Sequence, residues 1–289
     1  MSERTLKLRD AAVPYIYILP FLVSFAAFFV YPSFYSLKLS FYRYKGYGTA
    51  QWVGWDNYSN ALHYSTFWQS IGNTLFYLVG HIFPVMILSF ILAVFLHGKA
   101  VRRKSVYKPL IFLPQVVTAV AGALVFQIFF STQSGVINNW LGTEIPFLQN
   151  PALIKWPVIA FLVWRGIGWY LVIYLAGLTT INEEVNEAAL IDGASAMQRL
   201  LRITIPLMKP IFLFAFMIDA IASLKIYTEP NLMLNTAGNM PTAAMPVVNL
   251  LVNNINSGSF GMASAIGWLL FLLTLIVSAV QYAALRGRD

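Results

Sequence analysis

Glu187-Ala188-Ala189-Leu190-Ile191-Asp192-Gly193, followed by Ile203-Thr204-Ile205-Pro206, forms a polar island between two long apolar runs of this chain. The island and the residues that join its two parts carry both acidic and basic side chains, whereas the runs on either side are sparsely charged. A chain that is otherwise apolar has little reason to keep such a segment unless a partner docks on it. This polar loop is therefore a candidate docking segment.

The composition is that of a membrane protein. Of 289 residues, 58% are hydrophobic and 10% are charged, and the mean hydropathy is +0.68, outside the range of a soluble domain. A membrane-spanning helix needs about 20 mostly apolar residues. The apolar runs are continuous, which excludes a β-barrel, whose strands would alternate. We therefore predict an all-α integral membrane protein with six transmembrane helices at residues 15–39, 74–96, 110–130, 154–178, 210–227 and 260–285.

The segments between these helices are too short to fold separately, so we expect one transmembrane domain, 1–289, with the polar loop at 182–206 inside it. The chain has no Cys, which excludes a disulfide framework and a thiolate metal site.

Lys and Arg gather in alternate loops, and these residues stay on the cytoplasmic side. One side carries Arg4, Lys7, Arg9, Lys99, Arg102, Arg103, Lys104, Lys108, Arg199, Arg202, Lys209, Arg286 and Arg288. The other side carries only Lys38, Arg43, Lys45 and Lys155. Both termini are therefore predicted to be cytoplasmic. The net charge of +8 follows from this bias, and the basic side chains that cause it face lipid headgroups. No nucleic-acid partner is therefore expected.

The polar loop is predicted to contain two short helices separated by the turn-forming pair Asp192-Gly193. Ser195 and Gln198 match a capping box at the start of the second helix, and Pro206 would end it. That helix has one apolar face, made by Met197, Leu200, Leu201 and Ile205. The residues alone leave two interpretations open: a knob that docks into a partner, or an interfacial helix that rests on lipid.

The spacing of Glu187-Ala188-Ala189, Gly193 and Ile205-Pro206 resembles the EAA loop of permease subunits of binding-protein-dependent ABC importers. Ile205 replaces the more usual Leu before the Pro, and Asn182 replaces a common Pro. Further stretches are similar to the carbohydrate-import branch of that family, which includes maltose, glycerol-phosphate and arabinosaccharide types: Val53-Gly54-Trp55-Asp56-Asn57-Tyr58, Trp164-Arg165-Gly166-Ile167-Gly168-Trp169-Tyr170 and Leu175-Ala176-Gly177-Leu178. The resemblance extends from about Pro14 to Tyr282.

This resemblance implies a permease subunit of a sugar importer that lies in the bacterial cell membrane. Such a subunit has no catalytic residues and no cofactor of its own. The implied partners are a second related permease, two cytoplasmic ATPases and an extracellular solute-binding protein. The implied solute is a carbohydrate, and we expect an oligosaccharide. The chain itself lacks a Gly-x-x-x-x-Gly-Lys-Ser/Thr phosphate loop. The implied contacts of the knob with an ATPase are Glu187, Ala188, Ala189, Asp192, Gly193 and Pro206.

Ionisable residues within spans are expensive and usually functional, and Arg165, Asp219 and Lys225 are such residues. At about 1.5 Å per helical residue, Arg165 and Asp219 share a depth near the middle of the membrane. They could form a structural ion pair, or they could bind solute hydroxyls beside Trp164, Trp169 or Tyr170. The resemblance implies solute contacts at Gly166, Trp169, Asp219, Ser223 and Ile226, the last three on one face of the fifth span.

Three histidines, His63, His81 and His97, are scattered along the sequence and are expected to pack or to lie in loops rather than to form a metal site.

Rival functions are an ABC permease for a non-sugar solute, a secondary transporter and a membrane-embedded enzyme. A secondary transporter would need no docking knob. An enzyme is disfavoured because no catalytic cluster recurs at one depth.

The topology is testable because the chain has no Cys. Single Ser105→Cys and Ser195→Cys variants should be shielded from a membrane-impermeant thiol reagent in intact cells, whereas Ser257→Cys should react, because the distribution of Lys and Arg places only Ser257 outside. Labelling at Ser105 in intact cells would reverse the orientation.

Overall fold

The computed structural model describes residues 15, 17–98, 101–235 and 238–286, with side chains up to residue 283. Five helices among these residues are long and apolar enough to cross a membrane, and a bent pair of helices makes a sixth if the pair counts as one span. The chain is a multi-pass membrane protein, as predicted. Five basic residues used in the topology prediction lie outside the described residues: Arg4, Lys7, Arg9, Lys99 and Arg288.

The helical chain contains two compact units, one made by residues 1–64 and 251–269 and the other by residues 65–250 and 270–289. The first spanning helix, Tyr17–Ser40, lies in the first unit and has no buried residue in its most apolar window. It contains a π-helical turn, η1 (Ala26–Val30), followed by α2 (Tyr31–Ser40). The antiparallel strands β1 (Tyr42–Arg43) and β2 (Gln51–Trp52) and the helix α3 (Asp56–His63) follow.

Asn57 holds this first unit together. Its side-chain amide donates to the carbonyl of Ser40 at 2.8 Å and to that of Tyr42 at 3.0 Å. Ser40 is the last residue of α2, and Tyr42 is the first residue of the hairpin. The hydroxyls of Ser40 and Tyr58 are hydrogen-bonded at 2.7 Å. Gly261 approaches so closely that a Cβ there would clash with the Tyr42 carbonyl. The motif at residues 53–58 therefore has a structural role.

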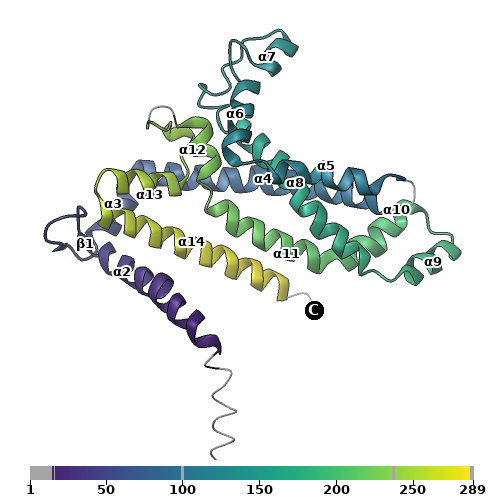
Figure 1. Ribbon diagram of the computed structural model, residues 1–289, viewed down its shortest axis with the longest axis horizontal. Coiled ribbons are helices and arrows are strands. Elements are labelled where there is room, and N and C mark those ends of the chain that lie inside the picture. The colour runs from purple at the N-terminus through teal and green to yellow at the C-terminus, as the bar shows by residue number, and fades with distance from the viewer. Residues whose placement is uncertain (1–14, 16, 99–100, 236–237, 287–289) are drawn as a thin grey trace, which may run out of the picture. The chain divides into compact units, whose positions relative to one another are not determined.

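The second unit is built on three helices, α4 (Ser65–His97), α8 (Lys155–Thr179) and α11 (Ile205–Leu224), which pack against one another (Figure 1). Their shared core is formed by the buried residues Val85, Ala93, Leu96, Tyr170, Leu171, Tyr174, Leu178, Met208 and Ala215. The Phe90 ring lies edge-on to the rings of Tyr174 and Phe212, so one aromatic side chain of α4 touches both other helices.

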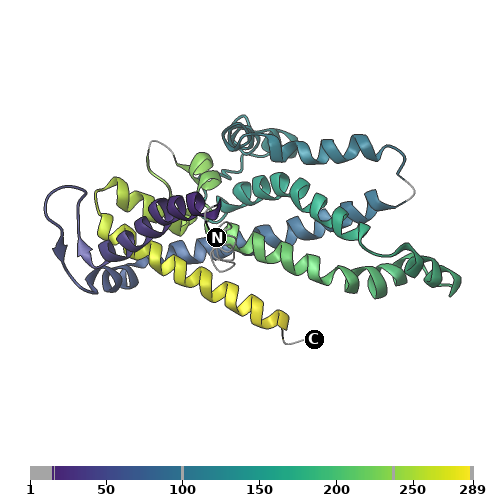
Figure 2. The same ribbon diagram turned by 60° about the horizontal axis from the view of Figure 1, so that its bottom comes forward.

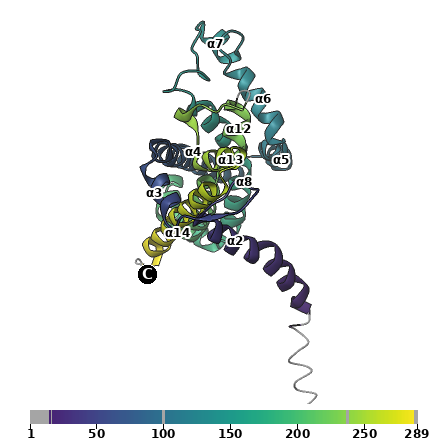
Figure 3. The same cartoon turned by 90° about the vertical axis from the view of Figure 1, so that its left-hand side faces the viewer.

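The predicted third span, 110–130, is not one helix. It divides into α5 (Lys104–Val116) and α6 (Ala119–Phe129), which meet at 92°, and Figure 3 shows α6 leaving the direction of α5. Pro114 removes a helix hydrogen bond just before the break. Val117 is extended, and the Thr118 hydroxyl accepts from the Ala121 N–H to begin a new helix. The proline and the capping threonine therefore break the helix, although the apolar pattern continues through this position.

Two short helices after α11 belong to the second unit: α12 (Thr228–Leu234) and η3 (Thr242–Ala244). The helices α13 (Val247–Asn256) and α14 (Phe260–Arg286) follow. Asn73 donates to the carbonyls of Thr242 and Met245, and the Tyr77 hydroxyl donates to that of Ala244. The Gln127 amide of α6 donates to Met233 in α12 at 2.8 Å. Side chains thus satisfy the backbone of this irregular segment.

Candidate functional sites: an exposed knob and a buried polar cluster

The loop between α8 and α11 forms the predicted helix-turn-helix. Its first helix, α9 (Glu183–Ile191), is capped by Asn182, whose side-chain oxygen accepts from the Glu184 N–H at 3.0 Å. Asp192 ends α9, and Gly193 makes the turn with φ of 80°, a conformation that side chains with a Cβ rarely adopt. The turn at Asp192-Gly193 is confirmed.

The second helix of the loop begins with the predicted capping box. The Ser195 N–H donates to the Gln198 side chain at 2.8 Å, and the Gln198 N–H donates to the Ser195 hydroxyl. This helix, α10 (Ala196–Arg199), passes through the π-helical turn η2 (Leu200–Thr204) directly into α11. The prediction that Pro206 ends the helix is wrong, because the helix continues through Pro206, which directly follows η2 and lies near the start of α11.

A continuous helix therefore runs from Ala196 to Leu224, which Figure 2 shows in green. The predicted span 210–227 began too late and ended too late. The helix stops at Leu224, so Ile226 lies beyond α11 and does not share its face with Asp219 and Ser223 as predicted. Ile226 is nevertheless buried.

The knob, defined here as residues 182–199, presents its functional candidates to the outside. Glu187, Ala188, Asp192 and Gly193 are exposed, and Ala189 is buried. Ile191 is 87% exposed and Leu190 is half-exposed, so the tip shows apolar side chains that the rest of the chain does not cover. Pro206, the last residue of the predicted set, is also exposed. This surface suits a protein contact better than free solvent.

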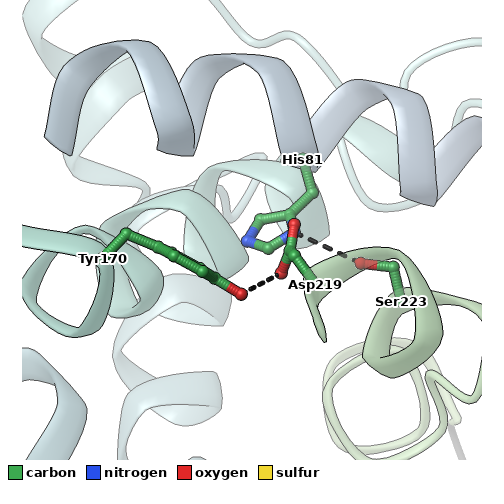
Figure 4. A network of polar contacts seen from close by, with 4 residues as sticks. All are labelled: His81, Tyr170, Asp219 and Ser223. Atoms are coloured by element: carbon green, nitrogen blue, oxygen red, sulfur yellow. Dashed lines mark hydrogen bonds and ion pairs between the residues drawn. The ribbon is translucent and has the colours of Figure 1, made fainter. Parts of the chain in front are cut away.

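A second set of polar residues is buried where α4, α8 and α11 meet, and we call it the polar cluster: His81, Tyr170, Asp219 and Ser223 (Figure 4). The Tyr170 hydroxyl donates to Asp219 Oδ1 at 2.7 Å. His81 Nδ1 is 3.4 Å from Asp219 Oδ2 and 3.4 Å from Ser223 Oγ. Each of the three helices thus supplies a member.

Gly166 makes room for this cluster. A Cβ at Gly166 would lie 3.2 Å from His81 Nε2 and 2.9 Å from a methyl of Val85. The glycine therefore lets α8 approach the His81 ring closely. Trp169, by contrast, is 47% exposed, and Lys225 is exposed at the end of α11.

The expected ion pair between Arg165 and Asp219 is not formed. Arg165 Nη1 instead donates to Glu229 Oε1 of α12 at 2.8 Å, and both side chains are partly buried. Equal depth along the membrane does not specify which way a side chain points around its helix. Glu229 could be reached because α11 ends at Leu224 and α12 turns back toward α8.

His81 is the member of the cluster that the sequence interpretation missed. The sequence predicts only a packing or loop role for it, because the three histidines are scattered and form no metal or acid–base constellation. The rule that ionisable residues inside a span are functional suspects applied to it as well, since residue 81 lies within the predicted span 74–96. Among the residues that the structure describes, no group of His, Asp or Glu side chains could hold a metal ion.

Comparison with known proteins identifies the class. Residues 85–288 match the model of the binding-protein-dependent transport system inner membrane component. The chain belongs to this family of permeases.

Curated relatives resemble it over most of their length. It is 30% identical to the lactose transport system permease protein LacF of Rhizobium radiobacter, over 95% of this chain and 94% of that one. It is 28% identical to the arabinooligosaccharides transport system permease protein AraP of Bacillus subtilis, covering 93% and 87% of the two chains. The trehalose/maltose transport system permease protein MalF of Thermococcus litoralis is 28% identical, covering 98% and 97%.

The fold is shared with a solved transporter. The crystal structure of a bacterial ABC transporter involved in the import of the acidic polysaccharide alginate contains a chain that superposes with a TM-score of 0.85 at 22% identity. The match covers 99% of this chain and 100% of that one. The TM-score shows that the two chains share a fold.

The Arg165–Glu229 pair yields a stability prediction. Glu229→Gln leaves a partly buried guanidinium without its counter-charge, which should cost about 1–3 kcal/mol. At about 2–4 °C per kcal/mol for a protein of this size, the melting temperature in detergent should fall measurably. The double variant Arg165→Gln/Glu229→Gln should recover part of the loss. Lys225→Gln, which removes an exposed charge at the end of α11, is the control. An unchanged melting temperature for Glu229→Gln would show that the pair contributes nothing.

Proposed function

We propose that this chain is a pathway-forming permease subunit of an ABC importer for oligosaccharides. The observation that carries the proposal is the combination of family membership with curated relatives that are permeases for lactose, arabinooligosaccharides and trehalose/maltose. The relatives agree on carbohydrate and differ in the particular sugar, so the proposal is made at the level of the solute class.

The chain would not hydrolyse ATP itself. Its knob would dock into one of two separate cytoplasmic ATPase subunits, with the exposed Glu187, Ala188 and Gly193 in the contact and Ile191 filling an apolar depression. The continuous helix from Ala196 to Leu224 supports this role, because a movement at the knob would be carried about 30–45 Å along one rigid element. ATPase closure would thereby rock the spans between inward-open and outward-open states.

The other proposed partners are a second, related permease and an external solute-binding protein. A solved relative with a TM-score of 0.82, described as a bacterial alginate ABC transporter in complex with alginate pentasaccharide-bound periplasmic protein, supports the latter. We place the chain in the bacterial cytoplasmic membrane as one transmembrane domain with the coupling loop 182–206 and both termini inside.

The solute is proposed to bind near mid-membrane, between this chain and the second permease. Gly166 and the exposed Trp169 would meet it first, since an indole can cover the apolar face of a sugar ring. Asp219 and Ser223 would supply hydrogen bonds to its hydroxyls, with Ile226 beside them. Because Asp219 and Ser223 are buried in the described arrangement, their contact with solute requires the helices to separate.

Coupling is tested by uptake of radiolabelled lactose, maltose and arabino-oligosaccharides in cells that express the chain with its partner subunits. Gly193→Val forces a β-branched residue into the left-handed region at a cost of about 1–2 kcal/mol, which would lower the docked fraction about 5- to 30-fold. Uptake and co-purification of the ATPases should fall while membrane insertion is kept. Gly142→Val is a matched control, because Gly142 has a similar φ of 65° and open space around it but lies outside the knob.

Failure of the wild type to transport any of these sugars, or to retain an ATPase during purification, would contradict the proposed function. Normal uptake by Gly193→Val would contradict the docking role of the knob. It would not contradict the proposed solute class, which the uptake by the wild type tests.

The placement of the solute site is tested by Asp219→Asn and Ser223→Ala. A missing hydrogen-bond partner costs about 1–3 kcal/mol, so the half-saturation concentration for uptake should rise about 5- to 150-fold while folded yield is kept. A lower yield with unchanged half-saturation would assign Asp219 to structure alone. Tyr227→Phe, which changes a hydroxyl beyond the end of α11, is a suitable control.

A further inference from the structure

Asp219 and Ser223 are closed off in this arrangement of the helices. Their exposed fractions are 3% and 8% even in the chain taken alone, without any second permease to cover them. A sugar hydroxyl cannot reach them unless something moves. The residues that contact their polar atoms are His81 from α4 and Tyr170 from α8 (Figure 4).

Of these two, Tyr170 is the firm partner and His81 is the weak one. The Tyr170 hydroxyl is 2.7 Å from Asp219 Oδ1, an ordinary short hydrogen bond. His81 Nδ1 lies 3.4 Å from both Asp219 Oδ2 and Ser223 Oγ, at the long limit of hydrogen bonding. Asp219 Oδ2 is fully buried and has no hydrogen bond. One ring nitrogen therefore serves two polar groups, and satisfies neither well.

We propose that His81 is a positioning residue that holds the solute site closed until sugar hydroxyls displace it. This inference rests on the proposed function. A buried carboxylate oxygen without a hydrogen bond has much to gain from a better donor. A sugar hydroxyl can donate to Asp219 Oδ2 and also accept from Ser223 Oγ, which replaces two long contacts of His81 by short ones.

The same contact would connect the site to the knob. His81 is on α4, whereas Asp219 and Ser223 are one turn apart on α11, which continues into the knob. While His81 bridges both residues, it also holds α11 against α4. Solute that displaces His81 would therefore remove this contact between α4 and α11, the helix that the ATPases are proposed to move. The glycine at position 166, which leaves space beside His81 Nε2, gives the ring its place in the closed arrangement.

The closing role is tested first without any solute, by the labelling rate of a Ser223→Cys variant with N-ethylmaleimide in membrane vesicles. Adding His81→Ala should raise the rate about fivefold or more, because the ring that covers position 223 is gone. Adding His81→Asn, whose amide can replace Nδ1, should leave the rate near that of Ser223→Cys alone. Ser89→Cys is the matched control, since Ser89 is fully buried on α4 and bonds to Ile167 instead of the cluster.

Two labelling results would overturn the proposal. One is an unchanged rate at position 223 when His81→Ala is added. The other is an equal rise at position 89, which would mean that the substitution loosens the whole helix packing. A rise confined to position 223 and reversed by His81→Asn supports it.

The second measurement is ATP hydrolysis by the purified assembly, with and without a sugar that the uptake assay identifies. His81→Phe keeps an aromatic ring but cannot bond, so hydrolysis without solute should rise at least about fivefold, and the stimulation by solute should shrink. A residue with a structural role alone would lower both rates together, and that result would contradict the proposal. His97→Phe is the control for the same exchange at the exposed end of α4.

The two hypotheses fail in different ways. A wild-type assembly that none of the sugars stimulates contradicts the proposed function, whereas the labelling result, which uses no sugar, decides separately whether His81 closes access to Ser223.

Discussion

The structure depends on one constraint: lipid offers no hydrogen bonds, so every polar group within the membrane must find its partner inside the protein. Helices meet this demand for the backbone. Polar side chains meet it by gathering where helices cross, and the polar cluster of His81, Tyr170, Asp219 and Ser223 is such a place. The irregular segment 242–247 is possible because Asn73, Thr74 and Tyr77 supply bonds to its backbone.

Close packing of α4 and α5 against α8 follows from small residues at the contacts. A Cβ at Gly168 would lie 2.6 Å from the Ile111 carbonyl, so α5 and α8 touch through their backbones there. Gly166 plays the same part beside His81. The glycines that the resemblance marked in the fourth span thus have a physical reason that is independent of any solute. They let helices approach until polar side chains from different helices can meet.

One helix joins the knob to two members of the polar cluster. The helix from Ala196 to Leu224 carries the capping box of the knob at one end and Asp219 and Ser223 at the other. A π-helical turn at Leu200–Thr204 lies between them, just before Pro206. Such turns add a residue to the helix without breaking it, and often occur at functional positions. The proposed function needs a connection of this kind, because it places the solute site and the ATP site on different proteins.

Composition and local pattern determined the class of this protein: the long apolar runs, the alternation of basic loops and the capped polar loop could all be predicted, because they depend on residues near one another in the sequence. The break at Thr118 and the end of α11 at Leu224 were missed, because helix ends depend on individual caps and prolines that an apolar average conceals. Only the tertiary structure decided that Arg165 pairs with Glu229 and that His81 joins Asp219. Depth in the membrane can be counted along the chain, whereas the direction of a side chain around its helix is set by the helices that pack against it.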